Sequence, residues 1–199
     1  MEPKKHGPWT INDVRTVYAN PWVTVRHHDV TRADGSPGVY GVISYANLAI
    51  GILPLFADGT VPLVGQFRFP LGRSTWELPE GGGPKDEPPL VSARRELKEE
   101  TGYSAARWLH YGEADLSNSV SDERAHLFLA WELEAGEATP EPDEVFTYKR
   151  VTLGELLRDI HAGRVDDALT QLLVLTAVTR ALTGELPEGP RDLILAAIR

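Results

Sequence analysis

Residues 81–103 read GGGPKDEPPLVSARRELKEETGY and contain the clearest local pattern in the chain. The pair Pro88-Pro89 suits the entry of a helix, and Gly102 suits a left-handed helix end. Between them, apolar side chains recur at helical spacing and predict a stripe that packs on the core: Leu90, Ala93 and Leu97. The stretch therefore predicts a glycine-rich loop followed by a half-buried helix.

Three carboxylates share one face of this predicted helix. At helical geometry, Glu96, Glu99 and Glu100 fall within an arc of roughly 100° beside the apolar stripe. Like charges this close repel one another, whereas a hard divalent cation such as Mg²⁺ binds carboxylate oxygens well. Arg95 precedes Glu99 by four residues and can pair with it, and the glycines at 81–83 let backbone approach a metal or a phosphate. The alternative is an ordinary solvated helix face.

The rest of the chain is read from its hydrophobic pattern and its turn residues. Strands are predicted at 22–26, 39–44, 48–56, 61–69, 74–78, 125–133 and 145–151, helices at 153–161 and 166–182, and a last apolar piece at 193–198. Residues 48–56 are almost wholly apolar, which is typical of a strand buried on both faces. Residues 79–84 are expected to form a loop without regular structure. Strands first and helices late favour a mixed α/β sandwich over a doubly wound sheet.

Composition sets further limits. The chain has 199 residues, a net charge of −9 and no cysteine, which excludes disulfide scaffolds, thiol catalysis and cysteine-bound zinc. The excess of acidic residues disfavours non-specific binding of nucleic acid, because such binding depends on Lys and Arg side chains that contact phosphates. The sequence shows neither a membrane-spanning run nor a secretory signal, so we expect a cytoplasmic protein that binds neither membrane nor nucleic acid. The histidines, including His27 and His28, show no metal-ligand spacing and are expected to be surface or strand residues.

The spacing within residues 81–103 also carries a resemblance. Gly81, Glu87, Arg95-Glu96, Glu99-Glu100 and Gly102 supply all seven fixed identities of the Nudix box. At roughly 6% usage each, a chance match is on the order of 10⁻⁹ per start position. The chain therefore resembles the Nudix hydrolases, which cleave a nucleoside diphosphate linked to another moiety.

The likeness extends beyond the box. Residues 65–68 (GQFR), 76–82 (WELPEGG) and 163–168 (GRVDDA) look like the branch that hydrolyses ADP-ribose and nucleoside diphosphate sugars. This resemblance implies an α/β/α sandwich around a mixed sheet, with an N-terminal β subdomain at 1–45 and the Nudix domain with its C-terminal helices at 46–199. In this branch the N-terminal subdomain is commonly exchanged between partners of a homodimer, so a homodimer is expected.

Metal ligands and catalytic groups are carried over by position. The resemblance implies metal ligands at the side chains of Glu96, Glu99, Glu100 and Glu144 and the backbone carbonyl of Glu80. Catalytic roles fall to Glu99, Glu100, Glu144 and Glu123, with Glu141 and Asp143 as further candidates for the general base. The alternative for residues 141–144 is a solvated acidic turn. Mg²⁺ is the expected cofactor, with Mn²⁺ as a substitute.

Substrate contacts are implied in the same way at Trp22, Arg68, Glu77, Gly81, Gly82 and Glu123. Trp22 would stack on the base; its alternative role is that of an ordinary core tryptophan. Arg68 would bind a phosphate; its alternative is a surface charge at a strand end. One departure concerns the loop before Ser121-Asp122-Glu123, which reads LSNSV at 116–120 where ADP-ribose enzymes typically carry Pro-Gly. This departure favours a broader or different nucleotide-sugar preference.

The expected function is Mg²⁺-dependent hydrolysis of the pyrophosphate bond of ADP-ribose or a related nucleoside diphosphate sugar, giving NMP and a sugar phosphate. Two alternatives stay open. One is a Nudix hydrolase of another substrate, such as a dinucleoside polyphosphate, a coenzyme or an oxidised nucleoside triphosphate. The other is a non-catalytic module that senses a nucleotide, although such modules often lose box glutamates that this chain retains.

Overall fold

The computed structural model describes residues 2–138 and 146–198, and the chain divides into two compact units. The first unit is Met1–Leu48 with Ala114–Arg124, and the second is Ala49–Glu113 with Ala125–Arg199. The first unit thus includes a segment, Ala114–Arg124, that the predicted boundary at residue 45 leaves with the second domain.

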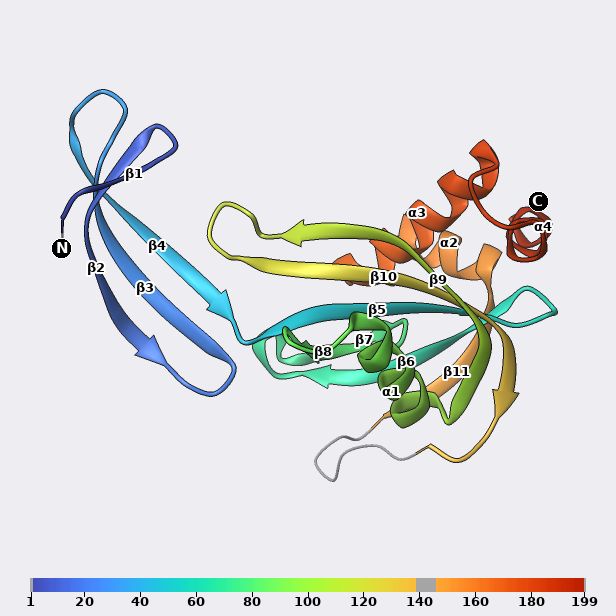
Figure 1. Cartoon of the computed structure of the whole chain (residues 1–199). Coiled ribbons are helices and arrows are strands. Elements are labelled where there is room, and N and C mark those ends of the chain that lie inside the picture. Colours follow the sequence, from blue (N-terminus) through green and yellow to red (C-terminus); the bar gives the residue numbers. More distant parts are fainter. Residues whose placement is uncertain (1, 139–145, 199) are drawn as a thin grey trace. The chain divides into compact units, whose positions relative to one another are not determined.

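The first unit is built on an antiparallel four-stranded sheet in the order β1-β2-β3-β4 (Figure 1). Its strands are β1 (Lys4–His6), β2 (Trp9–Ala19), β3 (Val23–Thr31) and β4 (Pro37–Tyr45). The β2–β3 turn is fixed by Asn20, whose side-chain oxygen accepts the backbone N–H groups of Trp22 and Val23 at 2.9 and 2.8 Å. Residues 117–122 pack along β4, where the N–H of Ile43 donates to the carbonyl of Val120 at 2.8 Å.

The second unit holds two sheets, ordered β8-β5-β10-β9 and β11-β6-β7. The strands are β5 (Asn47–Leu55), β6 (Thr60–Arg68), β7 (Arg73–Glu77), β8 (Glu80–Pro84), β9 (Tyr103–Leu116), β10 (Glu123–Ala135) and β11 (Thr147–Thr152). β5 and β10 run parallel, and β6 pairs antiparallel with both β7 and β11, so the arrangement is mixed. Residues 50–55 of β5 are all buried, as expected for a strand covered on both faces.

Helices cover both faces of the sheet that contains β5 (Figure 1). They are α1 (Pro89–Thr101), α2 (Leu153–His161), α3 (Ala168–Thr183) and α4 (Glu188–Ala197), with a short 3₁₀ turn, η1 (Phe69–Leu71). Ile50 lies beside Ser92 of α1, whereas the next residue, Gly51, lies against Leu169 and Leu173 of α3. Because successive residues of a strand face opposite sides, α1 and α3 lie on opposite faces. The predicted mixed α/β sandwich with an N-terminal β subdomain is confirmed.

One prediction of local structure was wrong, and one strand was not predicted. Residues 80–84 were expected to be irregular but form β8, the edge strand beside β5. Residues 103–116 form β9. This strand was not predicted because it is largely half-exposed and buries only Tyr111. The last apolar piece is the second half of α4. Val145, the predicted start of β11, lies outside the described residues.

Candidate active site

The box helix begins and ends as its sequence predicts. Pro88 precedes its first turn, and Gly102 ends it at φ 76°, with its N–H donating to the carbonyl of Lys98 at 2.9 Å. Ala93 and Leu97 are fully buried, while Leu90 is half-buried. The loop before the helix is tied to it because Ser92 donates a hydrogen bond to Glu87 at 2.6 Å. The apolar stripe therefore fixes which face of α1 carries the three carboxylates.

Arg95 organises that carboxylate face. Its Nη1 lies 2.8 Å from Glu96 Oε1 and 3.1 Å from Glu99 Oε2, and its Nη2 donates to the carbonyl of Gly82 at 2.9 Å. Partial burial alone would lower the pKa of Arg95, but the charges of Glu96 and Glu99 outweigh it and raise that pKa. One guanidinium thus joins α1 to β8 and neutralises part of the acidic face.

Strand β8 supplies backbone to the same place. The N–H of Glu80 donates to Glu100 Oε2 at 3.2 Å. A Cβ on Gly81 would overlap the carboxylate of Glu96, so glycine is required there for the carboxylate to reach its position. This explains in steric terms why the first box position is a glycine.

The carboxylates and the glycine backbone together fit a hard divalent cation. Carboxylate and carbonyl oxygens are the donors that such cations prefer, and here they come from neighbouring elements of one compact unit. Within residues 2–138 and 146–198, the oxygens of Glu96, Glu99 and Glu100 do not form a set of three within 4.8 Å of one another. Arg95 holds two of these groups and the N–H of Glu80 holds the third.

A second cluster centres on Arg68 at the end of β6. Its Nε donates to both oxygens of Glu77 at 2.9 and 3.0 Å, and its Nη2 donates to Glu80 Oε1 at 2.9 Å. Glu77 is buried and also accepts a hydrogen bond from Thr75. The hydrogen bonds that Arg68 donates to Glu77, partly opposed by burial, raise the pKa of Arg68. Arg68 is therefore a half-buried charge at the strand end, held in place by Glu77.

The Arg68 cluster lines a cavity of about 420 Å³ to which a distant segment also contributes. Asp166 lies 2.5 Å from Arg73 across the cavity, and Asp167 caps α3 by accepting the N–H of Thr170 at 2.7 Å. Burial, followed by the charges of Asp167 and Glu77, raises the pKa of Glu80 well above its ordinary value. Three motifs separated in sequence, at 65–68, 76–82 and 163–168, thus meet at one hollow in the second unit.

The first unit carries two other predicted site residues. Trp22 is 68% exposed, so it is not a core tryptophan. Asp122 accepts the N–H of Tyr45 at 3.0 Å, which fixes the segment that carries Glu123. Burial, with a smaller contribution from Asp122, raises the pKa of Glu123.

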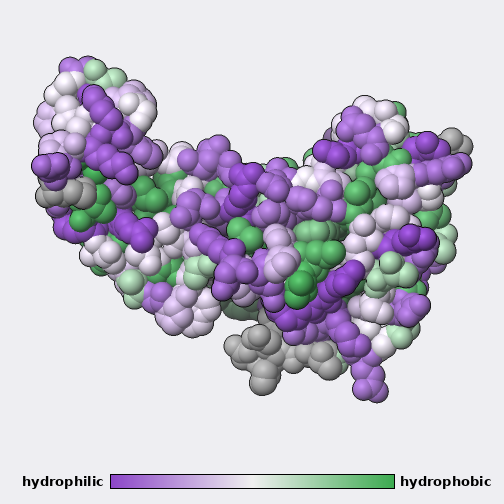
Figure 2. Space-filling view, in the orientation of Figure 1, coloured by the Kyte–Doolittle hydropathy of each residue, from purple (hydrophilic) through white to green (hydrophobic). Residues whose placement is uncertain are grey.

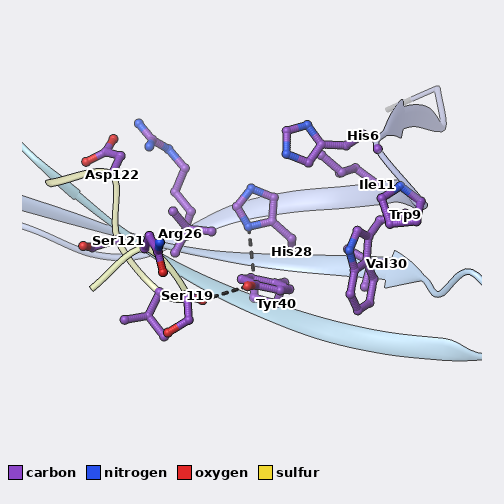
Figure 3. A pocket seen from close by; sticks show the side chains of 15 residues that line it. His6, Trp9, Ile11, Arg26, His28, Val30, Tyr40, Ser119, Ser121 and Asp122 are labelled. Carbon is purple, nitrogen blue, oxygen red and sulfur yellow. Dashed lines mark hydrogen bonds between the residues drawn. The ribbon is translucent and has the colours of Figure 1, made fainter. Parts of the chain in front are cut away.

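A cavity of about 550 Å³ lies within the first unit, between its sheet and the segment 118–122 (Figure 3). Tyr40 joins the two sides of this cavity. Its hydroxyl donates to the carbonyl of Ser119 at 2.7 Å, and its own carbonyl lies 3.3 Å from His28 Nδ1. Arg26, Trp9 and His28 also line it, so its wall is both aromatic and basic.

The predicted site residues are thus distributed over both units. The first unit contains Trp22 and Glu123. The second unit contains the box glutamates together with Arg68, Glu77 and residues 80–82. Glu141, Asp143 and Glu144 lie outside the described residues. The anchoring of Arg68 by Glu77 was not predicted, although the two residues lie nine apart, each near the end of a predicted strand (61–69 and 74–78).

The face of the molecule in Figure 2 is mainly hydrophilic, with smaller hydrophobic areas among the hydrophilic side chains. None of the helices in the described part of the chain has both the length and the apolar character that a membrane span requires.

Comparison with known proteins matches both parts of the chain. Residues 46–172 match the NUDIX domain, and residues 9–43 match the nucleoside diphosphate sugar hydrolase N-terminal domain. A protein of Bacillus subtilis named ADP-ribose pyrophosphatase is 32% identical over 77% of this chain and 84% of its own length. A second ADP-ribose pyrophosphatase, from Mycobacterium tuberculosis, is 33% identical over 72% of this chain and 70% of its own.

Two further similarities are more distant. The methanol dehydrogenase activator of Bacillus methanolicus is 29% identical over 79% of this chain and 86% of its own. A crystal structure described as an ADP compounds hydrolase superposes with a TM-score of 0.80, at 21% identity, over 92% of this chain and 98% of that one. The latter likeness shows the shared fold.

Proposed function

The chain belongs to the Nudix family of hydrolases, and on this premise we propose that it hydrolyses the pyrophosphate bond of ADP-ribose or a related nucleoside diphosphate sugar. The products would be NMP and a sugar phosphate. The observation that carries the proposal is the junction of β8 and α1, where Gly81 leaves room for the carboxylate of Glu96 beside Glu99 and Glu100. The names of the two pyrophosphatase relatives and the match of residues 9–43 support the nucleotide-sugar branch.

We propose Mg²⁺ as the metal, with Mn²⁺ as a substitute, since the family typically uses a divalent cation. It would be held by the carboxylates of Glu96, Glu99 and Glu100 and the carbonyl of Glu80, with Glu144 as a further ligand. When bound, such a cation offsets phosphate charge and lowers the pKa of a coordinated water.

The chain's own residues would do the rest. Arg68, held in one orientation by Glu77, would present its guanidinium to a substrate phosphate as a charged hydrogen-bond donor. Glu123, Glu141 or Asp143 would accept the proton of the attacking water as it adds to one phosphorus and the pyrophosphate P–O bond breaks, and Glu99 would hold or position that water. Trp22, exposed in the first unit, would stack on the base, and Gly81 and Gly82 would let backbone approach the diphosphate.

We also propose that residues 1–45 form a dimerisation subdomain and residues 46–199 the catalytic domain of a homodimer. The support is a set of exposed apolar side chains on the first unit that a partner would cover: Val17, Tyr18, Trp22 and Val39. Light scattering of the full chain tests this, and a monomeric mass at micromolar concentration would contradict it.

The substrate class is tested by product analysis on a panel with Mg²⁺. The panel contains ADP-ribose, GDP-mannose, ADP-glucose, UDP-glucose, a diadenosine polyphosphate and a nucleoside triphosphate. We expect NMP from the diphosphate sugars, and we expect EDTA to abolish its release. Hydrolysis of only the polyphosphate or only the triphosphate would contradict the assignment to the nucleotide-sugar branch. Nucleotide binding detected by calorimetry without any hydrolysis would indicate a nucleotide-sensing module.

Replacing Gly81 with Ala tests the junction itself. The added Cβ must displace the carboxylate of Glu96, so we expect the Mg²⁺ concentration for half-maximal rate to rise about tenfold or more. Gly189→Ala is the matched control, because its Cβ would meet nothing within 4 Å. An unchanged Mg²⁺ requirement in Gly81→Ala would show that Glu96 does not hold the metal.

A further inference from the structure

A cluster of two imidazoles and one carboxylate lies in the second unit on the strands β9 and β10, which are neighbours in the sheet (Figure 1). His110 and Glu113 come from β9 and His126 from β10. His126 Nδ1 is 3.2 Å from His110 Nε2 and 3.5 Å from Glu113 Oε1, and His110 Nε2 is 3.7 Å from the same oxygen. We propose that these three side chains form a binding site for a Zn²⁺-like transition-metal ion, separate from the box carboxylates.

The distances among the three ligand atoms support a single shared ion. In a tetrahedral zinc site the Zn–N and Zn–O bonds are about 2.0–2.2 Å, which places neighbouring ligand atoms roughly 3.3–3.6 Å apart. The three separations in this cluster, 3.2, 3.5 and 3.7 Å, lie close to that range. Little movement of the side chains is therefore needed to close around an ion.

The ligand set selects the metal class. Imidazole suits zinc, nickel and copper, whereas Mg²⁺ prefers a shell of oxygen atoms. The box offers oxygen atoms only, from Glu96, Glu99 and Glu100, so the two sites differ in the cation they favour. Three protein ligands leave a fourth tetrahedral position for water or an external ligand.

The surroundings hold the rings in place while leaving the site accessible. The His110 ring lies 4.9 Å from the buried ring of Phe128 and 5.2 Å from the His126 ring, measured between centroids. The His126 side chain is 12% exposed, whereas those of His110 and Glu113 are 40% and 36% exposed. An ion can therefore reach the cluster from solvent without opening the core, and would join two neighbouring strands when bound.

The test is a Zn²⁺ titration of the full chain, stripped with a chelator and then saturated with Mg²⁺ so that the box is occupied. We expect one Zn²⁺ per chain by calorimetry, and visible Co²⁺ absorption typical of a tetrahedral site. Zn²⁺ should also raise Tm. His126→Gln should weaken Zn²⁺ binding about tenfold or more and remove the Tm shift.

Glu113→Gln is a second variant with less risk to folding, because Glu113 is exposed. It should also weaken binding, whereas His161→Gln, at the end of α2 and outside the cluster, should bind as the unaltered chain does. Glu100→Gln should keep this Zn²⁺ site. Equal Zn²⁺ affinity in His126→Gln, Glu113→Gln and the unaltered chain, or loss of binding in Glu100→Gln alone, would overturn the proposal.

Discussion

Glu100→Gln is expected to lower kcat on the preferred nucleoside diphosphate sugar by about 100-fold or more, since loss of a neighbour of a metal ligand alone typically costs 10–100-fold. The amide keeps the size of the side chain and can still accept the N–H of Glu80, now found at 3.2 Å from Glu100 Oε2. What it loses is the negative charge that a divalent cation requires. Steady-state rates with Mg²⁺ at saturating substrate measure the effect.

The fold should survive this change. Glu100 is half-buried on a face where three carboxylates repel one another, so removing one charge relieves repulsion instead of breaking the core. We therefore expect an unchanged or slightly higher Tm without metal. Glu188→Gln, an exposed carboxylate in the first turn of α4, is the control and should keep full activity. A kcat of Glu100→Gln within threefold of the unaltered enzyme would refute the assignment.

The part of the site that the sequence predicts well is set by local interactions. Helix α1 follows from its proline entry, its glycine end and its apolar period, all of which act within about four residues. The carboxylates at 96, 99 and 100 then share a face by helical geometry alone. The spacing of the box is informative for the same reason. The interactions of its fixed positions lie within one loop and one helix that are contiguous in the sequence.

Contacts between distant segments could not be predicted in this way. β8 is glycine-rich and reads as a loop, yet it pairs at the sheet edge with β5, about thirty residues earlier in the chain. Close approach to Glu96, Ser92 and Ile50 explains the glycines at 81 and 83 better than turn formation does. A local pattern carries no information on which distant strand supplies the hydrogen bonds.

The histidine cluster was missed for a related reason. His110 and His126 are sixteen residues apart, a spacing that matches no metal motif in a helix or a tight loop. They meet because β9 and β10 are adjacent, and β9 itself was not predicted. A prediction that residues 103–116 and 123–135 form two paired strands joined by a turn at 117–122 would have placed the two imidazoles close together.

Arg68→Ala is expected to affect both substrate binding and stability. Loss of a charged hydrogen bond to phosphate should raise KM about tenfold or more, with a smaller effect on kcat if Arg68 contacts substrate and transition state alike. Removal of the guanidinium also leaves the buried Glu77 without its principal partner, next to Glu80. Breaking such a pair costs about 3 kcal/mol, or roughly 6–12 °C in Tm for a chain of this size.

A double variant separates the lost contact from the stranded charge. Arg68→Ala with Glu77→Gln should be more stable than Arg68→Ala alone, because the neutral amide does not need a cation in a buried position, yet its KM should stay high. Arg73→Ala is the control: its ion pair with Asp166 is half-exposed and should change stability by no more than about 1 kcal/mol. If the stability losses of the two single variants simply add in the double variant, Glu77 does not act through Arg68. Recovery of Tm with KM still high would instead show that the stranded charge of Glu77 causes the loss of stability and the missing guanidinium causes the rise in KM.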